Sequence, residues 1–153
     1  MLKSILLTGA IVLTSFSANS AELIGSVDTA KNLLGPNDKV IVERYDDPDI
    51  KNVSCYVSRA VTGGLANSIG ISEDRSRFSI ACRATGKIYY NVSDIKKDKI
   101  LFRSKTSFFF KSLNMIRMYD KETNVVSYLT ISTKLIDGSP YNSLSAVSLN
   151  LYK

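Results

Sequence analysis

The chain has 153 residues, two cysteines, no histidine and a formal net charge of +6 at pH 7. Without histidine the sequence excludes a Ser-His-Asp or Cys-His nucleophilic site, histidine-ligated zinc and the commonest general base of enzymes. The length is suited to one domain with a single hydrophobic core.

The beginning of the chain has the layout of a secretory signal peptide. Lys3 precedes an apolar run from Ile5 to Phe16, and small residues surround Ser20 and Ala21. The run is shorter than the roughly 20 apolar residues that span a membrane. We therefore predict a signal peptide over residues 1–21, cleaved after Ser20 or Ala21, and export to the periplasm. The alternative is an uncleaved interfacial anchor.

The mature chain, residues 22–153, is predicted to form a single domain without a transmembrane segment. Alternation of apolar and polar residues with a period of two recurs along it, which is typical of strands. The expected strands are 40–42, 53–59, 78–83, 88–92, 108–119, 125–132 and 147–151.

Between these strands the pattern is less regular. Residues 28–34 stay ambiguous, although Gly35-Pro36 resembles a helix stop. Ser72 is suited to cap one helical turn, and 120–124 reads as a hairpin turn between two strands. A shift of apolar parity predicts a bulge near Lys111-Ser112. The fold class is therefore mainly β: an antiparallel sheet, sandwich or barrel-like, with at most one or two short helical turns.

Cys55 and Cys82 are expected to form a structural disulfide. An exported protein meets an oxidising compartment, and the pair lacks the close C-x-x-C spacing of a redox site, the functional alternative. Alternation puts Cys55 on the same strand face as Val53 and Val57, and Cys82 on the face of Phe78. Both sulfurs are therefore predicted to point toward the core.

Positive charge is concentrated between residues 96 and 121. A basic surface can attract anionic lipid or glycan, whereas the alternative is a solvated face that keeps the protein soluble. The candidate anion-binding residues are Lys96, Lys97, Lys99, Arg103, Lys105, Lys111 and Arg117.

No catalytic motif is complete. Ser93 and Lys96 match the S-x-x-K nucleophile pattern, but its companion motifs are missing. Residues 81–88 resemble a P-loop without its first glycine and its Ser/Thr. The carboxylates of Asp46, Asp47 and Asp49 could hold Ca²⁺ or, like Glu73-Asp74, supply a glycosidase pair; a solvated turn is the simpler interpretation. We predict no catalytic residue, cofactor or metal.

Several segments together carry a resemblance to a known family. They are Ile24–Thr29, Asp46–Arg59, Thr62–Gly64, Ser79–Cys82, Thr106–Ser107, Phe110–Leu113, Tyr128–Leu129, Gly138–Pro140 and Ser145–Val147. In these segments the chain resembles the CreA family of small exported bacterial proteins, so residues 22–153 are expected to be one CreA-like domain. The resemblance spans nearly the whole mature chain and keeps both cysteines. It implies a periplasmic location in a Gram-negative bacterium and no activity or catalytic residues.

These observations favour a non-enzymatic binding or accessory module of the cell envelope. Candidate partners are an envelope protein or an anionic envelope polymer, and export argues against nucleic acid. Two alternatives stay open. One is an envelope hydrolase that uses carboxylates or the Ser93/Lys96 pair, and the other is a binder of anionic lipid or glycan through residues 96–121.

Overall fold

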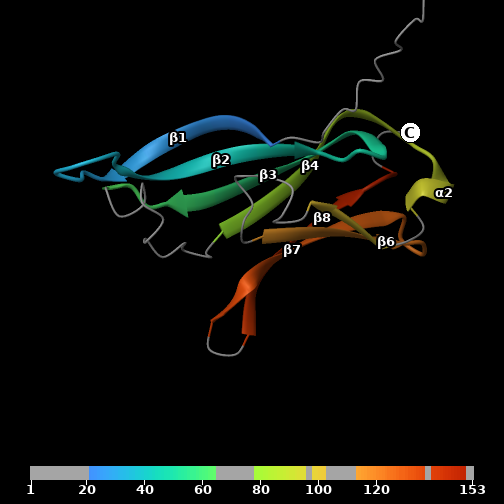
Figure 1. The fold of residues 1–153 in the computed structure, drawn as a ribbon. Helices are drawn as coiled ribbons and strands as arrows, with labels where there is room; N and C mark the ends of the chain where they lie inside the picture. The colour runs from blue at the N-terminus through green and yellow to red at the C-terminus, as the bar shows by residue number, and fades with distance from the viewer. Residues whose placement is uncertain (1–20, 65–77, 96–97, 103–112, 137–138, 151–153) are drawn as a thin grey trace, which may run out of the picture.

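The computed structural model describes residues 21–64, 78–95, 98–102, 113–136 and 139–150 (Figure 1). These residues form two antiparallel four-stranded sheets and the short helix α2 (Val92–Ile95). The first sheet consists, in spatial order, of β1 (Glu22–Ala30), β2 (Asp38–Asp46), β3 (Ile50–Val61) and β4 (Phe78–Tyr90). The second consists of β5 (Lys99–Phe102), β6 (Leu113–Asp120), β7 (Val125–Ile136) and β8 (Ser139–Ser148). The predicted mainly β, antiparallel fold is confirmed.

The two sheets share one hydrophobic core, and they lie one above the other in Figure 1. β4 and β8 meet along one side, where the amide of Cys82 donates a hydrogen bond to Ser145 Oγ at 2.8 Å. Rings also join the sheets, since Tyr45 packs edge-on against Phe102 with centroids 4.8 Å apart. Within the described residues no helix is long and apolar enough to cross a membrane.

The disulfide joins neighbouring strands of the first sheet. Cys55 on β3 is directly opposite Cys82 on β4, and the S–S distance is 2.04 Å. Both cysteines are buried beside Val53, Val57 and Phe78, as the alternation predicts. The bond therefore lies in the core and ties two strands of one sheet together.

Two strands bury a face that the apolar pattern does not indicate. On β2 the buried residues are Ile41, Glu43 and Tyr45, whereas Val40 and Val42 are half-buried. The buried carboxylate of Glu43 is compensated by Arg59 on β3, which donates a hydrogen bond to it with 3.0 Å between Nε and Oε2.

On β7 the apolar Leu129 and Ile131 are only half-buried, and the alternating Tyr128, Thr130 and Ser132 face the core. Apolar alternation therefore predicts this strand correctly but does not indicate which of its faces is buried.

Several element boundaries also differ from expectation. The ambiguous stretch 28–34 begins as the end of β1 and continues as bends, and no helix forms there. The strands expected at 78–83 and 88–92 are one strand, β4. The last strand, β8, begins at Ser139 and ends at Ser148, before the buried Leu149. The expected turn at 120–124 is present between β6 and β7.

Some predictions lie outside the described residues. They are the signal peptide over 1–20, the helical turn at Ser72, the start of the strand expected at 108–119 and the bulge at Lys111-Ser112.

Candidate functional site

The turn between β2 and β3 is shaped by its own aspartates. We call residues 46–52 the aspartate turn. Asp47 Oδ1 accepts hydrogen bonds from the backbone amides of Asp49, at 2.8 Å, and Ile50, at 3.1 Å. An aspartate whose side chain accepts hydrogen bonds from the amides two and three residues ahead stabilises a tight turn locally, independently of the hydrogen bonds between the strands. Asn52 ends the turn with φ 64°, a left-handed conformation that asparagine tolerates well.

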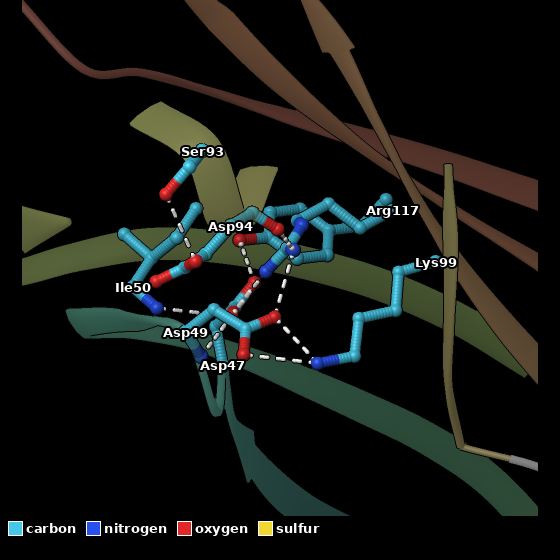
Figure 2. A network of polar contacts seen from close by, with 8 residues as sticks. Asp47, Asp49, Ile50, Ser93, Asp94, Lys99 and Arg117 are labelled. Carbon is cyan, nitrogen blue, oxygen red and sulfur yellow. Dashed lines mark hydrogen bonds and ion pairs between the residues drawn. The ribbon is translucent and has the colours of Figure 1, made fainter. Parts of the chain in front are cut away.

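Arg117 on β6 reaches this turn from the other sheet (Figure 2). Its Nη1 donates to Asp47 Oδ1 at 2.6 Å, and its Nη2 donates to Asp49 Oδ2 at 2.8 Å. Nη2 also lies 3.1 Å from the carbonyl oxygen of Asp94 in α2. The guanidinium group therefore binds the aspartate turn and α2 at once, through the planar fork of donors that arginine offers.

Two further residues complete the arrangement. Tyr128 Oη on β7 donates to Asp47 Oδ2 at 2.7 Å. Lys99 Nζ on β5 lies 2.7 and 2.9 Å from the two carboxylate oxygens of Asp49. We call Asp47, Asp49, Lys99, Arg117 and Tyr128 the ion-pair cluster. It contains two carboxylates and two cations, so its formal charge is zero.

Burial makes this cluster a strong structural constraint. The side chains of Arg117 and Asp47 are 0% and 1% exposed, whereas those of Asp49 and Lys99 are 18% and 46% exposed. A buried ion is tolerated only when a partner and hydrogen bonds compensate its lost hydration. Removing either Arg117 or Asp47 would therefore leave an uncompensated charge in the core.

The pKa values follow from these contacts. Burial alone would raise the pKa of Asp49, but the hydrogen bonds from Lys99 and Arg117 outweigh it and hold the pKa below the ordinary value. Burial would lower the pKa of Arg117, but Asp47 and Asp49 raise it. Burial, together with the charge of Asp47, raises the pKa of Tyr128 far above its usual range. At neutral pH the Asp49 carboxyl is therefore ionised and the Tyr128 phenol is neutral.

Groups in these states are poor participants in acid–base chemistry. A general acid or base must exchange a proton near the working pH, which the Asp49 carboxyl and the Tyr128 phenol do not. Asp47, in turn, is buried behind Arg117 and Tyr128. The cluster therefore stabilises the packing of the two sheets and fixes the aspartate turn.

Two open hollows flank the fixed turn. The first, which we call the tyrosine hollow, has a volume of about 620 Å³. It is lined by Pro48, Asp49, Lys51, Asn52, Tyr89, Tyr90, Asn91 and Asp94. The second, the arginine hollow, has a volume of about 470 Å³. It is lined by Arg44, Asp46, Asp47, Ile50, Lys51, Asn52, Val53, Ser54, Tyr56 and Thr85. Lys51 and Asn52 belong to both, so the turn forms the ridge between them.

The structure corrects the interpretation of a solvated aspartate turn. Asp46 is exposed, but Asp47 is buried and is a ligand of Arg117. In the described part of the chain, no three His, Cys, Asp or Glu residues are grouped so that they could hold a metal ion. Ser93 is exposed and its hydroxyl donates to Asp94, whereas Lys96 and the Glu73-Asp74 pair lie outside the described residues.

The candidate anion-binding residues differ in their surroundings. Arg117 is fully buried, so it is not available to an external anion, and this corrects its assignment to a basic surface. Lys99 is half exposed and pairs with Asp49. The others, Lys96, Lys97, Arg103, Lys105 and Lys111, lie outside the described residues.

The sequence contained one usable signal for the cluster. Arg117 has the same strand parity as Leu113 and Met115, and all three are buried. An arginine that continues an apolar face predicts a buried cation, which needs an acidic partner. Nothing in the sequence pattern indicates Tyr128 or the hollows, because their neighbours come from other strands.

The fold and the site define a class: a small antiparallel β protein whose two sheets are joined through a buried ion-pair cluster. Residues 24–151 match the family model described as CreA protein. The chain is 48% identical over 132 residues to Protein CreA of Escherichia coli (strain K12), which covers 83% of each chain. The proteins of the same name from strains O6:H1 and O157:H7 show the same identity and coverage. This chain therefore belongs to the CreA family, as the sequence resemblance predicts. No solved structure matches it.

Proposed function

We propose that this protein is exported to the periplasm and works there as a non-enzymatic binding module of the cell envelope. Its ligand would lie against the aspartate turn, in the tyrosine hollow and the arginine hollow. The signal-peptide pattern and the Cys55–Cys82 disulfide support export, because such bonds persist in oxidising compartments.

One observation carries the proposal. Two of the carboxylates that could have supplied catalysis, those of Asp47 and Asp49, are held by internal cations, and the turn that they fix stands between two open hollows. The volumes of the two hollows fall in the range of about 300–1,000 Å³ that is usual for small-molecule sites. A rigid rim beside an open, polar hollow favours binding, since little ordering is needed when the ligand arrives.

Affinity capture from envelope extract tests this function. The mature protein is immobilised, and bound lipids, glycans, peptides and proteins are identified by mass spectrometry. Asn91→Trp fills the tyrosine hollow from its exposed rim. Lys31→Trp, the matched control, adds the same side chain at the exposed position directly after β1, and Lys31 lines neither hollow.

We expect one reproducible species on the wild type and on Lys31→Trp, with much less on Asn91→Trp. Identical captured material on all three proteins would contradict the placement of the site. Turnover of an envelope substrate by pure wild-type protein would contradict the non-enzymatic assignment and support the alternative of an envelope hydrolase. Capture that disappears in high salt on every variant would favour the basic stretch 96–121 instead.

A further inference from the structure

The tyrosine hollow presents two opposite charges that do not neutralise each other. Lys51 and Asp94 both line it, and no ion pair joins them. Within the described ranges the Lys51 side chain makes no hydrogen bond or ion pair, and the Asp94 carboxylate accepts only the Ser93 hydroxyl, at 3.1 Å. One cation and one anion therefore remain available to a ligand.

The other charged residues that line the two hollows are already paired. Asp49, which also lines the tyrosine hollow, is bound by Lys99 and Arg117. In the arginine hollow, Arg44 pairs with Asp46 and Glu22. Among the charged residues that line the tyrosine hollow, only Lys51 and Asp94 therefore have no ion pair with another described residue.

The spacing of these two residues is held by the ion-pair cluster. Lys51 belongs to the aspartate turn and Asp94 to α2, which are distant in sequence. Arg117 Nη2 donates to both segments: to the aspartate turn through Asp49 Oδ2, at 2.8 Å, and to α2 through the Asp94 carbonyl oxygen, at 3.1 Å (Figure 2). Since the buried guanidinium is hydrogen-bonded to both segments, the aspartate turn and α2 are held next to each other before any ligand binds.

The wall of the hollow adds an apolar surface. Tyr89 is 54% exposed, so much of its ring is open to contact. Pro48, in the aspartate turn, also lines the hollow. A tyrosine offers a large apolar body at a low entropic cost. The hollow thus combines a positive group, a negative group and an aromatic face.

We propose that the tyrosine hollow binds a small zwitterion, of amino-acid to short-peptide size, that carries one carboxylate and one ammonium group. The carboxylate lies at Lys51 Nζ, the ammonium group lies at the Asp94 carboxylate, and the apolar part packs on Tyr89. This inference rests on the proposed binding function and names the ligand class of the same site.

The test uses the mature protein labelled with ¹⁵N and trialanine as the probe. Three forms of the peptide are titrated: one with free termini, one N-acetylated and one C-amidated. We expect saturable shift changes for the free peptide in the amide signals of residues 49–52 and 89–94. Each blocked form should bind up to about fivefold more weakly, because it loses one solvent-exposed charge pair.

Two charge-neutralising variants locate each end of the peptide. In Lys51→Gln, C-amidation should bring no further loss of affinity, and in Asp94→Asn, N-acetylation should bring none. Lys31→Gln removes a charge outside the hollow and should retain both penalties. This crossed design separates a specific contact from a general effect of net charge, and folded spectra of all variants exclude unfolding as the cause.

The outcomes separate this inference from the proposed function. Equal binding of the free, acetylated and amidated peptides, or penalties that persist in both variants, would overturn the zwitterion. If trialanine produces no shifts while envelope capture still depends on Asn91, the ligand class is wrong and the binding function stands. If neither assay detects binding at the hollow, both proposals are rejected.

Discussion

Arg117 is the residue on which the interior of this protein most depends. It is an arginine with no exposed surface, and its charge is compensated by Asp47 and Asp49 from the facing sheet. Among the described atoms its Nε has no hydrogen-bond partner, so the compensation comes through the two terminal nitrogens. A buried pair of this kind is a weak source of net stability while it is intact, but it becomes costly when only one partner is removed.

Replacing Arg117 by methionine should therefore destabilise the fold strongly. The variant keeps a long apolar side chain but leaves the Asp47 carboxylate buried without a cation. We expect a loss of about 3–5 kcal/mol in the free energy of unfolding, measured by urea denaturation. Arg83→Met at an exposed position of β4 is the matched control and should change stability by less than about 0.5 kcal/mol. A loss below about 1 kcal/mol for Arg117→Met would show that Asp47 finds other compensation.

Asp49 should make stability depend on acidity. Its pKa is held below the ordinary 3.8 in the folded protein, so the folded state favours the ionised form. The resulting stability is fully present above pH 3.8 and is lost as the pH falls through the lower folded pKa.

Unfolding measured over a series of acidic buffers checks this dependence. Asp49→Asn should remove its contribution to the slope of stability against pH, and Lys99→Met should reduce that contribution, because one of the two cations remains. Unchanged slopes in both variants would assign the acid sensitivity to other carboxylates.

At the scale of elements, the connection from β1 to β2 is packed against the end of β3. The Asp38 carboxylate accepts hydrogen bonds from the Gly63 amide, at 2.8 Å, and from Asn32 Nδ2, at 3.0 Å. The Gly64 amide donates to the Pro36 carbonyl at 2.7 Å. The backbones approach so closely here that only glycine fits at residue 63, because a Cβ there would lie 2.0 Å from the Pro36 oxygen.

Gly63→Ala should therefore force the two segments apart. Overpacking of this kind typically destabilises a protein by about 1–3 kcal/mol, which thermal or urea denaturation would measure. Gly25→Ala on β1 is the control, since a Cβ there meets no atom within 4 Å. Equal stabilities of the two variants would indicate that the β1–β2 connection can move away from β3 at no cost.

At the scale of the whole molecule, two different links hold the strands. The disulfide joins β3 to β4 inside the first sheet, and the ion-pair cluster joins the aspartate turn to β5, β6 and β7 of the second sheet. The first link is covalent and acts on chain entropy, whereas the second depends on burial and ionisation. Loss of the disulfide should consequently lower stability without altering the cluster.

The double variant Cys55→Ala/Cys82→Ala tests this separation. The bridge spans 27 residues, so its removal should cost about 3–4 kcal/mol in the chain-entropy model. Denaturation with and without a reductant measures the effect, and the reductant should change the wild type alone. A variant that loses both this stability and the acid dependence assigned to Asp49 would show that the two links are coupled.

Although the sequence did not predict β1 and β5 and indicated only the end of β8, it determined by itself the other strands, the oxidised cysteine pair and the family. These features depend on local alternation, on the number of cysteines and on motifs that are contiguous in the chain. Local alternation was less informative where both faces of a strand carry apolar residues. On β2 the triplet Val40-Ile41-Val42 fits either orientation, and on β7 the core face carries Tyr128 and Thr130 in place of the aliphatic side chains.

Only the tertiary structure decided which charges are buried. Arg117 and Asp47 are 70 residues apart, and Tyr128 and Asp47 are 81 apart, so no sequence window contains the cluster. Their contact arises because the aspartate turn of one sheet packs over β6 and β7 of the other. The same packing created the tyrosine hollow from the turn, the end of β4 and α2, since a concave surface is a property of how elements meet.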